Sequence, residues 1–227
     1  MSERGRYIVI EGSDGTGKST QVDILQNRLH EVGINSIQIH EPDGFEGNES
    51  LGIPSVPEAI ELRKRVKDAS FERTPWQNVE MFTRARELNW QQAMNPALKL
   101  GIWVLAARSW ISTVTYQGYG QGVDIDKIRA ITTERVGDKY LKPDLTLILT
   151  LEDEQARFNR IAERGALETP DTFESLPDEF QQAMQQGYVR YAHDFGIPTI
   201  DASTDKLKVS DEIWQYVHPF ITRQDSK

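Results

Sequence analysis

Short apolar runs and longer amphipathic stretches alternate along this chain, which is the pattern of an α/β protein. The run Tyr7-Ile8-Val9-Ile10 is apolar throughout, as in a strand that is buried on both faces. After a turn, apolar side chains recur at helical spacing, at Val22, Leu25, Leu29 and Val32. The pattern predicts strands at residues 7–10, 36–39, 101–107, 145–149 and 197–201, and further helices at residues 57–68, 76–100 and 152–165. Strands that alternate with helices indicate a parallel sheet covered on both faces.

The ends of the predicted strands are the expected ligand site, because ligands of such sheets bind beyond the carboxyl ends of the strands. Four of these ends carry glycine or polar residues, namely the segment after Ile10, His40-Glu41, Ala107-Arg108 and the segment after Leu149. No repeat, low-complexity tract or linker interrupts the pattern, so we expect a single domain over residues 1–227.

The composition excludes several classes of protein and of binding partner. The chain has 227 residues and a formal net charge of -9, which argues against binding to nucleic acid polymers along a basic face. It contains no cysteine, so disulfides, thiolate catalysis and cysteine metal sites are excluded. No apolar run has membrane-spanning length and no signal region precedes the first strand, so the cytoplasm is the expected location.

The segment Gly12 to Ser19 carries the most specific chemical signal. It fits the pattern G-x-x-x-x-G-K-[ST] of the phosphate-binding P-loop and lies between a predicted strand and a predicted helix, as that motif requires. Glycines let the backbone approach a polyphosphate, and the start of the helix supplies N–H groups and partial positive charge. The predicted phosphate-binding residues are Gly12, Ser13, Asp14, Gly15, Thr16, Gly17, Lys18, Ser19 and Thr20.

Two side chains of this loop have specific expected roles. Lys18 is placed to reach the β and γ phosphates of a nucleotide, and the Ser19 hydroxyl is placed to ligate Mg²⁺. The alternative is a glycine-rich turn that matches the pattern by chance. With the alternating elements, the motif predicts a three-layer P-loop NTPase fold, with a mostly parallel five-stranded sheet flanked by helices.

Segments beyond the P-loop resemble those of thymidylate kinases, in the same order and at roughly the same spacing from about Tyr7 to Ala202. The strings that carry this resemblance are Gly12 to Gln21, Glu41-Pro42-Asp43-Gly44, Glu80 to Arg86, Arg108 to Gly122, Pro143-Asp144-Leu145-Thr146 and Arg157 to Gly165. The resemblance implies a kinase that transfers phosphate from MgATP to dTMP or a close pyrimidine analogue. It also implies a helical lid at roughly residues 153–175 and a homodimer.

The resemblance implies that Phe82 stacks on the pyrimidine, that Arg86 donates to a base carbonyl and that Tyr116 packs against the sugar. The residues implied for the acceptor nucleotide are Asp14, Glu41, Phe82, Arg86, Arg108, Thr113, Tyr116 and Gln117. The residue types alone also fit a core phenylalanine, a surface ion pair and a loop with ordinary turn chemistry.

Phosphoryl transfer needs positive charge around the phosphates more than it needs covalent chemistry. We expect Lys18, Arg108, Arg160 and Arg164 to provide it, because Arg108 follows a buried strand and the lid arginines follow another. Arg157 shares the helical face of the two lid arginines and ranks behind them. The alternatives are a structural ion pair for Arg108 and a solvated charged face for the lid.

The chain departs from the family pattern at several positions. Ala107 stands where the family has aspartate before the catalytic arginine, His40 stands where it has arginine, and the P-loop lacks an arginine at Gly15 or Thr16. Two alternatives therefore stay open. The acceptor is another monophosphate, such as a 5-substituted dUMP, dGMP or dCMP, or the protein binds nucleotides without catalysis.

Overall fold

A five-stranded parallel sheet forms the centre of the fold in a computed structural model, which describes residues 3–67, 72–163 and 176–222. The strand order is β2-β3-β1-β4-β5, and every neighbouring pair is parallel. The strands are β1 (Tyr7–Gly12), β2 (Ser36–His40), β3 (Trp103–Ala107), β4 (Leu145–Thr150) and β5 (Thr199–Asp201). The predicted α/β fold and its five strands are confirmed.

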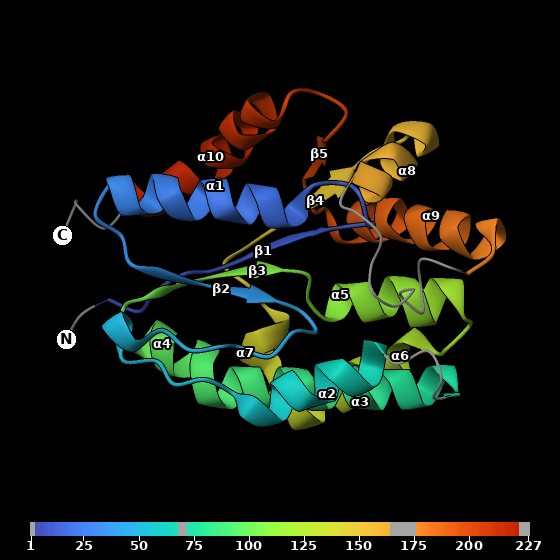
Figure 1. Cartoon of the computed structure of the whole chain (residues 1–227), viewed down its shortest axis with the longest axis horizontal. Helices are drawn as coiled ribbons and strands as arrows, with labels where there is room; N and C mark the ends of the chain where they lie inside the picture. Colours follow the sequence, from blue (N-terminus) through green and yellow to red (C-terminus); the bar gives the residue numbers. More distant parts are fainter. Residues whose placement is uncertain (1–2, 68–71, 164–175, 223–227) are drawn as a thin grey trace.

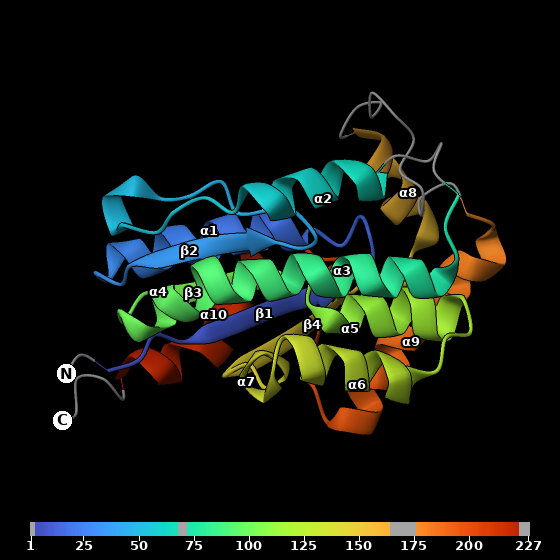
Figure 2. The same ribbon diagram turned by 90° about the horizontal axis from the view of Figure 1, so that it is seen from below.

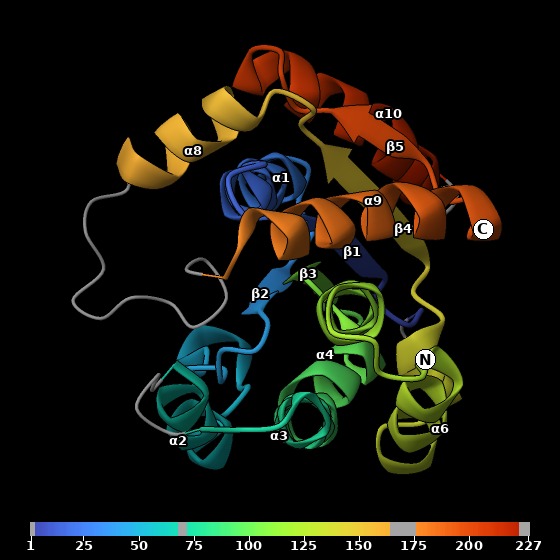
Figure 3. The same cartoon turned by 90° about the vertical axis from the view of Figure 1, so that its right-hand side faces the viewer.

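Helices cover both faces of the sheet and make three layers (Figure 1). They are α1 (Lys18–Glu31), α2 (Pro57–Lys67), α3 (Pro75–Asn89), α4 (Asn95–Lys99), α5 (Trp110–Thr113), α6 (Ile125–Arg135), α7 (Asp138–Leu141), α8 (Glu154–Glu163), α9 (Asp178–Phe195) and α10 (Lys206–Thr222), with short turns η1 (Glu49–Leu51), η2 (Trp90–Met94) and η3 (Val114–Gly120). On one face, α1 and α10 pack on Ile8 and Leu105, and on the other α3, α6 and α9 pack on Val9. Figure 2 looks onto the second face, and Figure 3 shows α9 crossing the end of the sheet.

The central strands follow from their sequence. All residues of β1 and β3 are buried, as a parallel sheet with two covered faces requires. The capping box of Thr74 and Gln77 begins α3, and a π-helical turn carries this helix on into α4, so the predicted helix at 76–100 is confirmed in outline. Val32, predicted on the apolar face of the first helix, is 51% exposed just beyond the end of α1.

Several helices were not predicted. The largest are α9 and α10. The segment of α5 and η3 is also helical, although its residue types fit a loop with ordinary turn chemistry as well. Of the predicted lid at 153–175, the structure describes α8, and residues 164–175 lie outside the described part. None of the described helices is long and apolar enough to cross a membrane.

All the strands run in one direction, so their carboxyl ends meet at one edge of the sheet. The P-loop follows β1 at this edge, Glu41 follows β2 and Arg108 follows β3. The fold therefore brings together residues that are far apart in the sequence.

Candidate active site

The P-loop connects β1 to α1 and is shaped to hold an anion. Gly15 has a φ of 84°, and a Cβ there would lie 2.9 Å from the carbonyl oxygen of Arg157, so both the backbone and the neighbouring chain require glycine. Gly17 caps α1 without a side chain, and the first turn of α1 carries no acidic residue. The N–H groups and the positive end of the helix dipole are therefore available to phosphate.

Some polar side chains of this loop are buried within it, and others are exposed to solvent. Lys18 is buried and its Nζ donates to the carbonyl oxygen of Ser13 at 2.7 Å, while Thr16 Oγ1 donates to the same oxygen at 2.8 Å. Ser19 and Thr20 are exposed at the start of α1. The lysine is thus held within the loop, and the serine hydroxyl faces solvent where nucleotide phosphates and a metal ion would meet.

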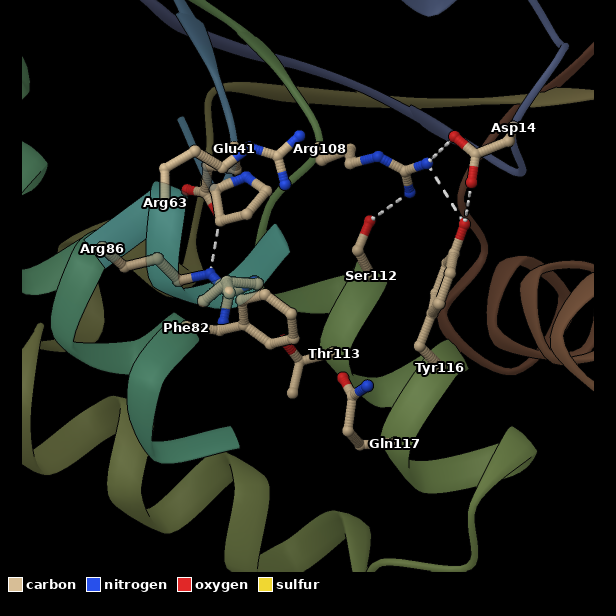
Figure 4. A pocket seen from close by; sticks show the side chains of 12 residues that line it. Asp14, Glu41, Arg63, Phe82, Arg86, Arg108, Ser112, Thr113, Tyr116 and Gln117 are labelled. Atoms are coloured by element: carbon tan, nitrogen blue, oxygen red, sulfur yellow. Dashed lines mark hydrogen bonds and ion pairs between the residues drawn. The ribbon is translucent and has the colours of Figure 1, made fainter. Parts of the chain in front are cut away.

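Arg108 lies at the centre of a polar network beside the P-loop (Figure 4). Its φ is 76°, the one left-handed value among the non-glycine residues that the structure describes. Its Nη2 donates to Asp14 and to the Tyr116 hydroxyl at 3.1 Å, and its Nη1 donates to Ser112 at 3.1 Å and to Tyr188 at 3.2 Å. A strained backbone held by this many contacts indicates a side chain whose direction matters for function.

Asp14 is the anionic partner in this network. Burial favours its neutral form, but the charges of Arg108 and Lys18 and the hydrogen bond from Tyr116 outweigh burial and hold the pKa of Asp14 well below its usual range. The Tyr116 hydroxyl donates to Asp14 at 2.7 Å, so the carboxylate fixes Tyr116 as well as Arg108.

Asp14 should therefore make stability depend on pH. A carboxyl group with a depressed pKa stabilises the fold fully above its unfolded pKa of about 4, and the stabilisation is lost as the pH falls toward the folded value. We expect Asp14→Asn to lower the free energy of unfolding at neutral pH, and we expect the difference from wild type to shrink below about pH 4. Urea denaturation across this range measures it, and a difference that stays constant with pH would refute the assignment.

Glu11 is the fully buried carboxylate at the end of β1. It receives five hydrogen bonds, from the N–H and hydroxyl groups of both Ser109 and Ser112 and from the Tyr188 hydroxyl, at 2.6–3.2 Å. This role has no local sequence signal, because its donors come from the N-cap of α5, from α5 itself and from α9. The carboxylate holds together the two segments that carry Arg108 and the P-loop.

A pocket opens between this network and α3. Its lining residues are Asp14, Glu41, Pro42, Arg63, Val66, Phe82, Arg86, Arg108, Ser112, Thr113, Tyr116 and Gln117. All eight residues predicted to hold the acceptor are therefore brought together. Arg63 and Val66 of α2 were missed, because a charged helix gives no sequence signal of which side chains face a pocket.

The far end of the pocket combines an aromatic ring with polar atoms. Phe82 lies 5.9 Å from the guanidinium carbon of Arg86, measured to the ring centre. Arg86 Nε donates to Glu41 at 2.5 Å, and its Nη2 donates to the carbonyl oxygen of Ser109 at 3.0 Å. Nine buried side-chain atoms have no hydrogen-bond partner in the described part of the chain, and three of them lie at this end of the pocket: Arg86 Nη1, Thr113 Oγ1 and Gln117 Oε1. Buried polar groups are rarely left unpaired, so these atoms indicate a ligand.

A model of the family described as thymidylate kinase matches residues 10–213 of the chain. The chain belongs to the thymidylate kinase family. It is 35% identical to a thymidylate kinase of Afipia carboxidovorans, with 93% of this chain and 88% of the relative covered. It is 34% identical to one of Rhodopseudomonas palustris and 35% identical to one of Bradyrhizobium diazoefficiens, with 95% and 94% of this chain and 90% and 89% of the relatives covered. The resemblance found in the sequence is confirmed.

Two of the departures from the family pattern lie at the carboxyl ends of β3 and β2. Ala107 is buried at the end of β3 and brings no carboxylate, while Asp14 and Glu11 bind the groups around Arg108 from the neighbouring strand and loop. His40 Nε2 lies 3.0 Å from Gln38 Oε1 and is not among the residues that line the pocket. The site therefore has no carboxylate at position 107, but the carboxylates of Asp14 and Glu11 lie close to Arg108.

Of the lid arginines, Arg157 lies against the P-loop. It is buried with 2% of its surface exposed, and its Cγ would lie 2.8 Å from a Cβ at Gly15. With the Gln185 amide turned to face it, Arg157 donates from Nε at 2.8 Å and from Nη2 at 3.2 Å. Arg160 is half-buried on α8, and Arg164 lies outside the described residues. Of the two lid arginines that the structure describes, the one ranked last by the sequence, Arg157, is thus held against the phosphate loop.

The donor set fits a magnesium ion that arrives with ATP. The described residues contain no group of three His, Cys, Asp or Glu side chains that could hold a metal. Ser19 offers a solvent-facing hydroxyl, and Mg²⁺ typically keeps several waters and takes phosphate oxygens with few protein ligands.

Proposed function

We propose that this chain transfers the γ-phosphoryl group of ATP to dTMP, with ATP on the P-loop and thymine against Phe82. The observation that carries the acceptor assignment is the set of unpaired polar atoms of Arg86, Thr113 and Gln117 beside that ring. Family membership supports phosphoryl transfer from ATP to dTMP, and these unpaired atoms support thymine as the base.

The polarity of these atoms matches thymine. Arginine donates and never accepts, so Arg86 Nη1 fits the O4 carbonyl of thymine and would oppose the amino group that cytosine has at the same place. Gln117 Nε2 donates to Gln121 at 3.4 Å, which leaves Gln117 Oε1 to accept from the N3–H of thymine. Thr113 Oγ1 can donate or accept and completes the set.

The other end of the pocket suits the sugar and phosphate. Tyr116 is held by Asp14 and Arg108 as a wall beside the expected sugar, where it would disfavour a ribose 2′-hydroxyl. Arg108 and Arg63 line the same pocket and provide positive charge for the acceptor phosphate. Both arginines are supported there by acidic partners, Asp14 and Asp43.

For the transfer step, Lys18 would bind the β and γ phosphates and Arg108 would bridge the two nucleotides. Arg157 and Arg160, together with Arg164, are proposed to neutralise charge from the lid. Mg²⁺, held by the Ser19 hydroxyl when bound with ATP, supplies further charge neutralisation on the phosphates. Closing α8 over the loop would exclude water and limit ATP hydrolysis.

A panel of acceptors tests this proposal by coupled ADP release. We expect dTMP and dUMP to be phosphorylated, and dCMP and dGMP to have kcat/KM values at least about 100-fold lower, because buried polar groups would be left unpaired or opposed. Comparable turnover of dCMP or dGMP would contradict the base assignment. Tight ATP binding without turnover of any acceptor would favour the non-catalytic alternative.

Three further inferences from the sequence stay predictions. They are one kinase domain over residues 1–227, a homodimer and a cytoplasmic location. Light scattering coupled to size-exclusion chromatography measures the mass in solution, and a monomer at working concentration would contradict the homodimer.

A further inference from the structure

Tyr140 is a buried residue of α7 that does not line the pocket. Its hydroxyl donates a short hydrogen bond to Glu41 Oε1, although the two residues are 99 positions apart in the sequence. Its ring packs against Tyr7, with centres 5.9 Å apart, and edge-on against Trp90, with centres 5.7 Å apart. The phenol is thus fixed from two sides and points at the carboxylate behind the pocket.

Each oxygen of the Glu41 carboxylate accepts a hydrogen bond from a different side chain. Oε1 accepts from Tyr140, and Oε2 accepts from Arg86 Nε at 2.5 Å. Glu41 and Arg86 have side chains that are only 1% and 3% exposed, so water is not at hand to replace either partner. The carboxylate therefore cannot turn away from Tyr140 without disturbing its bond to Arg86.

The guanidinium group of Arg86 has one nitrogen, Nη1, without a hydrogen-bond partner among the described residues. Nε and Nη2 are bound to Glu41 and to the Ser109 carbonyl oxygen, and Nη1 is left in the pocket without a partner in the described part of the chain. Because guanidinium is planar and rigid, fixing two nitrogens fixes the direction of the third. The direction of this donor depends on Glu41.

We propose that Tyr140 is a positioning residue for recognition of the acceptor base: its hydroxyl fixes Glu41, and through Glu41 it fixes the direction in which Arg86 Nη1 points. This inference rests on the proposed function, because it assigns the target of Arg86 Nη1 to the base. Burial and the neighbouring Glu41 charge raise the pKa of Tyr140 well above its usual range, so the phenol keeps its proton and donates. The element α7 thereby belongs to the acceptor site without touching the ligand.

Tyr140→Phe tests this inference, because it removes the hydroxyl and keeps the ring against Tyr7 and Trp90. We expect the KM for dTMP to rise about tenfold, as hydrogen bonds to charged groups predict, while kcat and the KM for ATP change by less than about threefold. A double-mutant cycle with Glu41→Gln should be strongly non-additive, because both substitutions act on one hydrogen bond.

Tyr191→Phe is the matched control. Tyr191 is also a buried tyrosine, packed edge-on against Trp110, but it lies outside the Glu41 contacts. We expect this variant to keep the wild-type KM for dTMP even where it lowers the melting temperature. Equal effects of the two variants on the KM for dTMP would overturn the proposal.

Two failures can be told apart. Wild-type protein that neither binds nor phosphorylates dTMP would overturn the proposed function and this inference together. Wild-type protein that phosphorylates dTMP, with a KM that Tyr140→Phe leaves within about twofold, would overturn only the role of Tyr140.

Discussion

Replacing Lys18 with alanine is expected to lower kcat about 1,000-fold while leaving the affinity for dTMP unchanged. Lys18 is buried in the P-loop, where its ammonium group is held at the Ser13 carbonyl oxygen. Charge that develops on the transferring phosphoryl group would meet this ammonium in a site shielded from solvent, where such contacts are strong. The pocket for dTMP is built from other residues, so acceptor binding should survive.

Coupled ADP release gives kcat, and isothermal titration gives the affinity for dTMP. Lys127→Ala is the matched control, because Lys127 is an exposed lysine of α6 away from the P-loop. A Lys18→Ala variant with more than about one tenth of wild-type kcat would show that the loop does not act on the transferred phosphate.

Replacing Arg108 with alanine is expected to lower kcat by a similar factor, about 1,000-fold, and also to lower stability. Both effects have a cause in the structure, because Arg108 faces the acceptor pocket and also pairs with the partly buried Asp14. Arg108→Lys should recover part of the stability and little of the activity, since a single ammonium nitrogen cannot replace both Nη1, which binds Ser112 and Tyr188, and Nη2, which binds Asp14 and Tyr116.

The double variant Arg108→Ala with Asp14→Asn separates the two effects. It removes the carboxylate that would otherwise be left without its partner, so we expect the melting temperature to rise relative to Arg108→Ala alone. We expect kcat to stay low. Activity that returns together with stability would mean that Arg108 is a structural residue only.

The parts of the fold that could be predicted are those with a local signal. Buried parallel strands are continuous apolar runs, and the P-loop is a local string, so both were found from the sequence. The residue types around Tyr116 and Gln117 also fit a loop with ordinary turn chemistry, yet the segment Val114–Gly120 forms π-helical turns against α9. Tertiary packing overrode the local preference there.

The residues of the site also fall into those with a local sequence signal and those without one. Phe82, Arg86 and Arg108 could be found from strings that resemble a family. The roles of Glu11 and Tyr140 could not, because each depends on a hydrogen bond between positions about 100 residues apart. Sequence also ranked Arg157 last among the lid arginines, since the contact between α8 and Gly15 exists only in the folded chain.

The position of the acceptor base is measured directly by a crystal structure of the complex with dTMP. We predict the thymine ring stacked on Phe82, with O4 at Arg86 Nη1 and N3 at Gln117 Oε1. A base bound elsewhere, with Phe82 packed away from any nucleotide, would contradict the account.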